Sequence, residues 1–307
     1  MSKIPVRHIT SLPFDISEAV KNGSALAGND FTEEQLGIWF SQEQEAFYSG
    51  DAGNSGVDPW YAYMRYVNER LAFSLVERTG RSDGSMLVIG PGSGKEVDRF
   101  VRDNSNWKIH FIEASLNFKA ELRTKFPKCV IVEPVISGDI ALKRATQDVV
   151  CAFSVLHHIP NVAKVLAEVS RVAKPGALFF VREPCSSMGD WRYARSATPN
   201  ERGISRSLLI DMAKRAGFEV ASTPIPILLE PINKVLKKTI GFSAIPFGLL
   251  YAVDRLVSKL VSGHDYYWRD TWLKKIGPSS YFYVFRKRQP PPKLPGESAF
   301  GDPSSRT

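Results

Sequence analysis

The chain has 307 residues, of which 43% are hydrophobic and 23% are charged, the ordinary balance of a folded globular protein. Its formal net charge of +8 permits acidic partners such as phosphorylated substrates, nucleic acid or anionic lipid without requiring them. The three cysteines are widely separated and form no CxxC pattern, so they indicate neither a disulfide framework nor a zinc site.

The N-terminal residues lack the apolar core of a signal peptide, and no apolar run is long enough to span a bilayer. We therefore expect a cytoplasmic protein. Two helices are predicted before residue 80. The first begins at Thr32, where Gln35 completes a capping box, and the second runs from Pro59 to about residue 78. Tyr63 on the second helix either packs on a sheet or closes over a ligand.

From residue 86 the chain alternates strand and helix. Strands are predicted near residues 86–89, 107–112, 129–132, 148–153, 177–181, 218–223 and 281–285, with helices beginning near 97, 116, 161 and 205. This order indicates a largely parallel sheet that is covered on both faces. Ligands of such sheets bind at the carboxyl ends of the strands. Glycine or polar residues occur there at Gly90, Glu113, Asp139, Ser154 and Glu183.

The glycine turn Gly90-Pro-Gly-Ser-Gly94 follows the first of these strands. A P-loop is rejected, because Ile89 occupies the position of its first glycine and Glu96 replaces the hydroxyl residue that holds magnesium. A dinucleotide fingerprint is disfavoured, because Lys95 stands where its third glycine belongs. A G-x-G-x-G turn with an acid at the end of the second strand is the remaining pattern.

In that order the residues resemble class I methyltransferases that use S-adenosylmethionine. The motifs that carry the resemblance are Gly90–Gly94, Glu113–Ser115, Gly138–Ile140, Phe153–His158 and Arg171–Gly176. The resemblance implies an α/β fold, a doubly wound, mostly parallel seven-stranded sheet of the Rossmann-like methyltransferase type. N-terminal helices and a helical insert before the last strand would be additions to it.

The resemblance also implies a binding site for S-adenosyl-L-methionine. Its glycines let the backbone approach the aminoacyl and ribose part, and Glu113 would accept hydrogen bonds from both ribose hydroxyls. Asp139 would bind the adenine amino group. The cofactor-binding residues implied are Gly90, Gly92, Gly94, Glu113, Ala114, Asp139, Ile140, Phe153 and Ser154.

Transfer to an oxygen acceptor needs a base in some enzymes, and His158 and Glu183 are the candidate catalytic residues. Each has a structural alternative: the histidine pair His157-His158 is often structural in the family, and Glu183 can be a packing carboxylate. No metal-binding constellation is evident. The acceptor expected is a small molecule, a glycan or a lipid-linked compound. The alternatives are a quinone-type carbon methyltransferase, an NAD(P)-dependent oxidoreductase and a non-catalytic cofactor-binding module. No nucleic acid partner is expected.

Five segments are predicted. Residues 1–80 form an N-terminal helical cap, 81–227 the cofactor-binding core, 228–279 a helical substrate lid or insert, 280–288 the last strand and 289–307 a disordered tail. The insert is expected to carry acceptor specificity. The insert carries two apolar stripes, one through residues 232–240 and the other through Leu249, Leu250, Val253, Leu256, Val257 and Leu260. They either bury a lid on the sheet or form a basic amphipathic surface in peripheral contact with a membrane.

Overall fold

A computed structural model describes residues 17–49, 59–187, 200, 202–228 and 246–289 of the chain. Within these residues, seven strands form one sheet in the order β3-β2-β1-β4-β5-β7-β6. The strands are β1 (Gly84–Ile89), β2 (Trp107–Ile112), β3 (Val130–Val132), β4 (Gln147–Phe153), β5 (Ala173–Pro184), β6 (Phe218–Ile227) and β7 (Ser280–Lys287). Strand β7 is antiparallel to both neighbours, and the other pairings are parallel. The α/β, doubly wound, mostly parallel sheet that the resemblance implied is confirmed.

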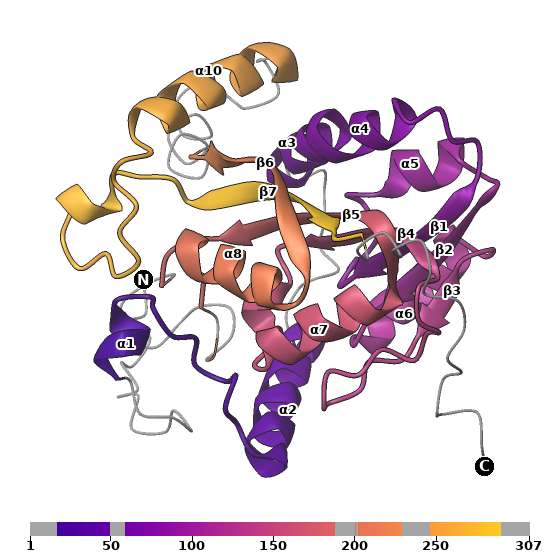
Figure 1. The fold of residues 1–307 in the computed structure, drawn as a ribbon, viewed down its shortest axis with the longest axis horizontal. Coiled ribbons are helices and arrows are strands. Elements are labelled where there is room, and N and C mark those ends of the chain that lie inside the picture. The colour runs from indigo at the N-terminus through magenta and orange to yellow at the C-terminus, as the bar shows by residue number, and fades with distance from the viewer. Residues whose placement is uncertain (1–16, 50–58, 188–199, 201, 229–245, 290–307) are drawn as a thin grey trace, which may run out of the picture.

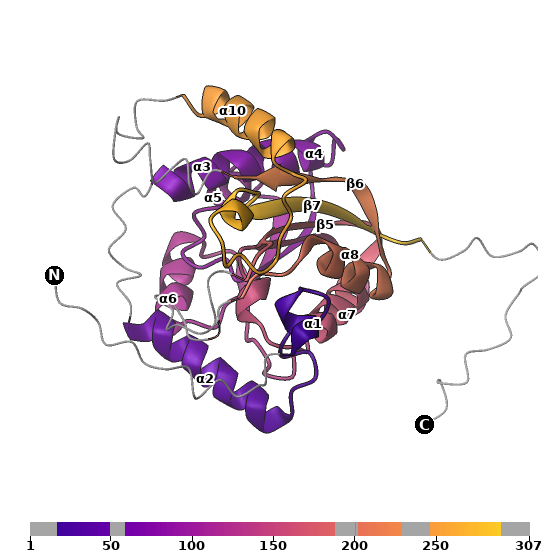
Figure 2. The ribbon, with the colours of Figure 1, turned by 90° about the vertical axis from the view of Figure 1, so that its left-hand side faces the viewer.

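Helices cover both faces of the sheet (Figure 1). On one face, α3 (Pro59–Asn68), the π-helical segment η1 (Glu69–Phe73), α4 (Ser74–Glu77), α5 (Asp98–Asp103), α6 (Leu116–Lys125) and α10 (Phe247–Leu260) enclose one hydrophobic cluster. On the other face, α7 (Val162–Val172) and α8 (Arg206–Arg215) enclose a second cluster. Figure 2 shows the two layers on either side of the strands.

The two predicted N-terminal helices lie in different parts of the fold. The capping box at Thr32 is confirmed, because Thr32 N donates to Gln35 Oε1 at 2.9 Å and Gln35 N donates to Thr32 Oγ1 at 3.3 Å. It begins α2 (Glu33–Ser49), which lies apart from both helix layers (Figure 2). Tyr63 on α3 is fully buried in the core, so it packs on the sheet and does not close over a ligand.

The helix after the glycine turn begins close to its predicted start. Gly90, Gly92 and Gly94 all have positive φ angles, which an α-helix does not accommodate. Helix α5 begins at Asp98, one residue after the predicted position, and has six residues. Val97, directly before the helix, and Phe100 within it are buried in the hydrophobic cluster on this face of the sheet.

Of the two alternatives for the apolar stripe on α10, burial on the sheet is wrong for most of its residues. Leu249, Val253, Leu256 and Leu260 are exposed, whereas the buried positions of the helix are Leu250, Asp254 and Ser258. The physical reason is a polar anchor on the inward face: Tyr63 Oη donates to Asp254 Oδ2 at 3.0 Å. The other predicted stripe of the insert, at residues 232–240, lies outside the described residues. Residues 290–307 of the predicted tail also lie outside them.

Candidate active site

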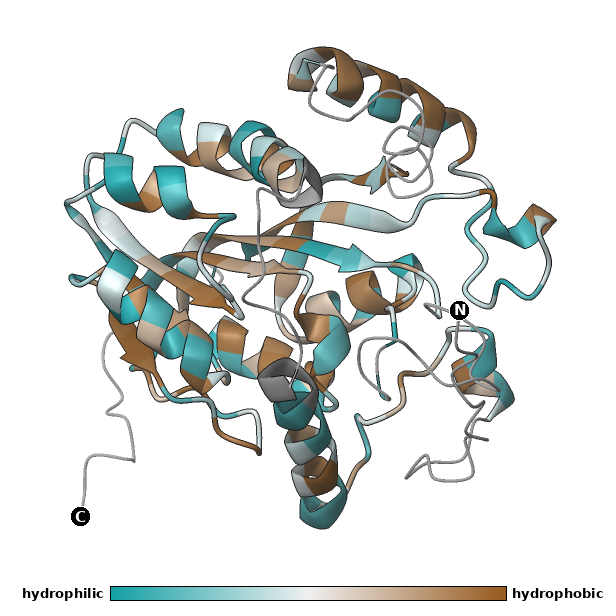
Figure 3. Cartoon of the chain, turned by 180° about the vertical axis from the view of Figure 1, so that it is seen from behind, coloured by the Kyte–Doolittle hydropathy of each residue, from teal (hydrophilic) through white to brown (hydrophobic). Residues whose placement is uncertain are grey.

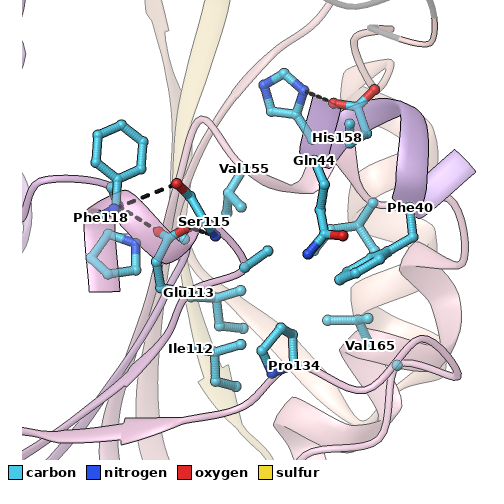
Figure 4. A pocket seen from close by; sticks show the side chains of 18 of the residues that line it. Phe40, Gln44, Ile112, Glu113, Ser115, Phe118, Pro134, Val155, His158 and Val165 are labelled. Carbon is cyan, nitrogen blue, oxygen red and sulfur yellow. Dashed lines mark hydrogen bonds and ion pairs between the residues drawn. The ribbon is translucent and has the colours of Figure 1, made fainter. Parts of the chain in front are cut away.

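A cavity of about 600 Å³ lies at the carboxyl ends of β1, β2, β4 and β5, where a doubly wound sheet places its ligands. Its wall opposite the strands comes from α2, through Leu36, Trp39, Phe40, Glu43 and Gln44. Figure 4 shows Phe40 and Gln44 pointing from α2 towards Ile112, Pro134 and Val165. No residue of α10 lines this cavity. Among the described residues, α2 therefore forms this wall, and residues 229–245 of the predicted insert lie outside the described ranges.

The glycine turn is joined to the end of β2 by a carboxylate. Gly92 N donates to Glu113 Oε2 at 2.9 Å, and Ser115 N donates to Glu113 Oε1 at 2.8 Å. A Cβ atom on Gly92 would have its nearest neighbour, in Phe118, 3.9 Å away, so the backbone here faces open space. Gly94 differs, because its Cβ would lie 2.6 Å from Phe126 and it does not line the cavity.

Glu113 is 7% exposed, and its burial raises the pKa of the carboxyl, while N–H groups of Ser115 and Gly92 counteract part of that rise. A carboxylate has about four lone-pair sites. Backbone N–H groups of Ser115, Gly92 and Ala114 use part of this capacity, and the rest remains available to a hydroxyl donor. This arrangement fits a hydroxyl group of a ribose.

The loop after β3 is held from behind by α7. Glu168 Oε2 accepts from Ile140 N at 3.1 Å, and Arg171 Nη2 donates to Ile140 O at 2.7 Å. Asp139 lies on the cavity side of this loop and pairs with Lys164, Nζ to Oδ1 2.6 Å. The hydrogen bond from Lys164 lowers the pKa of Asp139, so its carboxylate stays an acceptor at neutral pH.

Ser154, directly after β4, has a φ angle of 53°, a conformation that costs a non-glycine residue energy and occurs often at functional sites. Its N–H donates to Arg182 O at 2.7 Å, and its Oγ accepts from Arg182 Nη2 at 2.9 Å. The same nitrogen is 2.7 Å from Glu96 Oε1. Glu96 and Arg182 therefore form a charged pair in the cavity wall beside Phe153.

The segment from Val155 to Pro160 is fixed by two buried charged side chains. Glu183 Oε1 accepts from Val155 N and Leu156 N, both at 2.8 Å, and its Oε2 lies 2.7 Å from His157 Nδ1. Arg202 donates to the carbonyl oxygens of residues 157, 159 and 160. These contacts hold the segment rigidly at the cavity.

His158 extends from this segment into the cavity wall. Its Nδ1 lies 2.9 Å from Glu43 Oε2, the contact drawn as a dashed line at His158 in Figure 4. Its carbonyl oxygen accepts from Trp39 Nε1 at 2.8 Å. Glu43 is 7% exposed and, among the described residues, its Oε1 has no hydrogen-bond partner. The pair joins an imidazole to a buried carboxylate at the edge of the cavity.

The structure brings most of the sequence-predicted residues together. The cavity is lined by Gly90, Gly92, Glu113, Ala114, Asp139, Ile140, Phe153, Ser154 and His158. Gly94 and Glu183 do not line it. Glu183 is completely buried and both its oxygens are used by the segment behind His158, so its geometry is that of the packing alternative. We therefore give it a positioning role in place of the expected catalytic one.

Sequence reasoning missed Glu43, Gln44, Glu96 and Arg182. Their signals in the sequence are weak, because α2 carries an apolar face that is typical of packing and Glu96 belongs to no binding pattern beyond excluding a P-loop. No local pattern connects Glu43 with His158, because 115 residues separate them.

A methyltransferase domain model matches residues 62–223, just over half of the chain. The chain belongs to this methyltransferase domain family. The resemblance to class I, S-adenosylmethionine-dependent methyltransferases is thereby confirmed. The predicted enzyme class and cofactor are confirmed at the level of the family. A Mycolicibacterium smegmatis protein assigned as an S-adenosylmethionine-dependent methyltransferase is 27% identical over 167 residues, or 53% of this chain. The match spans 61% of that relative's length.

Two solved structures show the same fold. A protein assigned as a sarcosine dimethylglycine methyltransferase from Galdieria sulphuraria is 17% identical, with a TM-score of 0.50 over 73% of this chain and 86% of its own. The [4+2]-cyclase SpnF is 18% identical, with a TM-score of 0.51 over 87% of this chain and 98% of its own. Because one neighbour is named as a cyclase, the fold alone does not specify methyl transfer.

The cavity suits the family's cofactor. Its volume lies within the roughly 300–1,000 Å³ of small-molecule and cofactor sites, and the open backbone at Gly92 adjoins the acceptor oxygens of Glu113. In the described ranges, no cluster of three or more His, Cys, Asp or Glu side chains could hold a metal ion.

Proposed function

We propose that this protein transfers a methyl group from S-adenosylmethionine to an oxygen atom of a small-molecule, glycan or lipid-linked acceptor. One observation carries the proposal: a single cavity is lined both by the glycine turn with Glu113 and by the imidazole of His158, which a buried carboxylate holds. The first group of residues suits a nucleoside, and the second suits removal of a proton from an acceptor hydroxyl.

The cofactor supplies a methyl group that is already activated on a sulfonium. The chain's own residues then have three tasks. Glu113 accepts a hydrogen bond from a ribose hydroxyl, and Asp139 accepts one from the adenine amino group. The apolar wall formed by Phe40, Ile112 and Val165 excludes water from the cavity. These contacts align the donor with the acceptor, which is the main source of rate in such a displacement.

His158 acts as the general base in this proposal. With Nδ1 hydrogen-bonded to Glu43, the imidazole accepts the hydroxyl proton at Nε2, and the carboxylate stabilises the imidazolium that forms. Glu183, Arg202 and Trp39 hold the segment that carries the ring. Acceptor specificity would lie in α2, because Phe40 and Gln44 project into the cavity.

The carbon methyltransferase of the quinone type remains the second candidate, since the same pair can take a proton from an acidic carbon. The oxidoreductase is disfavoured by the family match and by Lys95 in place of the third glycine. A non-catalytic module is disfavoured by the intact cradle around Glu113.

The first experiment measures binding of S-adenosylmethionine, S-adenosylhomocysteine, NAD⁺ and NADP⁺ by calorimetry. Methyl-labelled S-adenosylmethionine is then incubated with hydroxylated small molecules, glycans and a lipid extract, and the product is analysed by mass spectrometry and NMR. Labelled methyl ethers or esters support the proposal, whereas label on carbon supports the second candidate. Tight binding without turnover in any acceptor class would indicate a non-catalytic module.

A further inference from the structure

Helix α10 exposes an apolar stripe and buries two polar side chains on its inward face. Its buried positions are Leu250, Asp254 and Ser258, whereas the opposite stripe is apolar and faces solvent. The exposed fractions in that stripe are 60% for Leu249, 42% for Val253, 62% for Leu256 and 75% for Leu260. Helices of globular proteins ordinarily turn such a stripe towards the core, so this arrangement leaves an apolar face without a partner among the described residues.

Polar contacts on the inward face fix this orientation. Asp254 accepts from Tyr63 Oη, from Leu228 N and from Ser258 Oγ, each at 3.0 Å. Phe247 at the start of the helix also packs against Tyr66, with ring centroids 5.8 Å apart. Rotating the leucines inward would break all three hydrogen bonds of a buried carboxylate, which is costly. The outward direction of the stripe is thus a built feature of the fold.

A second exposed apolar group follows in the short helix η4 (Leu273–Lys275). Trp272 is 71% exposed, Leu273 54% and Ile276 41%. Residues 247–276 contain eight of the thirteen large hydrophobic side chains that are exposed in the described parts of the chain. Figure 3 shows brown residues on α10 and on η4, both of which project from the end of the molecule that carries β6 and β7.

The charged residues around these two helices are mainly basic. Lys259 and Lys275 are exposed, Arg255 is half-buried, and the exposed Asp270 is paired with Lys274 at 2.8 Å. Helices that lie in a membrane interface typically combine leucine and tryptophan with lysine and arginine. The cationic side chains are attracted to anionic headgroups. None of the helices in the described ranges is long and apolar enough to cross a membrane.

We propose that α10 and η4 form a docking surface for the headgroup region of an anionic lipid bilayer. A symmetric contact with a second copy is disfavoured, because both copies would present the same mainly basic surface, with Lys259 and Lys275, to each other. The surface does not line the cavity, so the proposal concerns where the enzyme works and does not rest on the reaction. It deepens the lipid-linked choice of acceptor, which would share the same location.

The test uses the full chain with vesicles of phosphatidylcholine alone and of phosphatidylcholine with phosphatidylglycerol. Sedimentation should show binding to the anionic vesicles that weakens with added salt. The double variant Leu256→Gln/Leu260→Gln should lower the partition coefficient by about tenfold or more, because apolar insertion is lost. Lys259→Glu/Lys275→Glu should abolish the preference for anionic vesicles. Leu116→Gln, 55% exposed on α6, is the matched control and should bind like the native chain.

Three results would overturn the proposal. The first is the absence of binding to anionic vesicles, and the second is equal binding by the native chain and the leucine variant. The third is a dimer in analytical ultracentrifugation that the leucine variant loses while vesicles are not bound, which would assign the surface to a second copy. Calorimetry with S-adenosylhomocysteine on every variant checks that the cavity is intact. It also keeps this result separate from a failure of the proposed reaction.

Discussion

The Nδ1 atom of His158 lies 2.9 Å from the Oε2 atom of Glu43, a residue 115 positions earlier in the chain. The contact ties the segment after β4 to α2 and gives the candidate base a carboxylate partner. Trp39, one turn before Glu43, donates to the carbonyl oxygen of the same histidine. Helix α2 therefore sets both the backbone and the ring of His158.

If this pair removes the acceptor proton, His158→Ala should lower kcat by about 100-fold or more, the range of general-base catalysis. Glu43→Gln should lower kcat by about tenfold, because an amide stabilises the imidazolium less. The double variant should resemble His158→Ala alone, since Glu43 acts through the ring. The labelled-methyl assay measures kcat. Glu34→Gln, an exposed change on the same helix, is the control, and additive losses in the double variant would contradict the assignment.

Binding of S-adenosylhomocysteine should weaken on acidification, beginning above the ordinary glutamate pKa of about 4.3. Burial raises the pKa of Glu113, and its ionised form is the stronger acceptor for a ribose hydroxyl. The pH dependence that Glu113 gives to folding stability runs in the opposite direction to that of binding. A raised folded-state pKa makes the folded chain gain stability as the pH falls and lose it as the pH rises. Weaker binding at low pH therefore does not reflect unfolding caused by this residue.

Calorimetric titrations across the mildly acidic range measure this effect. Glu113→Gln should bind weakly at every pH and lose the pH dependence. Asp139→Asn should keep the pH dependence. In the native chain the hydrogen bond from Lys164 lowers the pKa of Asp139, so this carboxylate stays ionised and does not cause the pH dependence. Retention of the pH dependence in Glu113→Gln would move the assignment to another group.

Two glycines of the turn should respond differently to alanine. Gly94→Ala places a Cβ 2.6 Å from Phe126 at a φ of +72°, so the free energy of unfolding should fall by about 2 kcal/mol or more. In Gly92→Ala the new Cβ has no neighbouring atom closer than 3.9 Å. The free energy of unfolding should therefore fall by only about 1–2 kcal/mol, from the positive φ alone. Its larger effect should be weaker binding of S-adenosylhomocysteine, because the methyl group enters the cavity. Urea denaturation and calorimetry separate the two quantities.

Glu183 should matter for stability more than an exposed glutamate does. Glu183→Ala leaves buried N–H groups of Val155 and Leu156 without their acceptor, which should cost about 3 kcal/mol. Glu18→Ala breaks a pair with Lys21 in which both side chains are at least 45% exposed, and its cost should be below about 1 kcal/mol. Equal midpoints of the two variants in urea denaturation would show that Glu183 does not hold the segment.

A positioning role of Glu183 makes a separate kinetic prediction for the conservative variant Glu183→Gln. Glu183→Gln keeps an acceptor oxygen for the backbone N–H groups and should recover most of the stability. It should still lower kcat, because His157 and the segment that carries His158 are held less firmly. Cofactor affinity should change little, since Glu183 does not line the cavity.

The core of the fold was predictable because its signals are local. Apolar runs predicted β1, β2 and β4 to within a residue or two, and Thr32 with Gln35 predicted the start of α2. The glycine turn and Glu113 stand next to their strands in the sequence. Parallel strands bring their carboxyl ends to one edge, so proximity in the fold followed from position in each strand.

Other features depended on contacts between distant segments, for which the sequence has no periodicity. Nothing local assigns Glu43 to His158, or distinguishes a catalytic Glu183 from one that holds backbone N–H groups. The apolar stripe of α10 was compatible with burial or with an exposed amphipathic surface, and the hydrogen bonds of the buried Asp254 hold it outward. The sequence by itself determined the strands, the glycine turn and the family's cofactor cradle, since these rest on residue type and spacing. Only the tertiary structure decided the partner of His158, the cavity wall opposite the glycine turn and the exposed face of α10, because a buried charge takes whichever donors the packed chain brings to it.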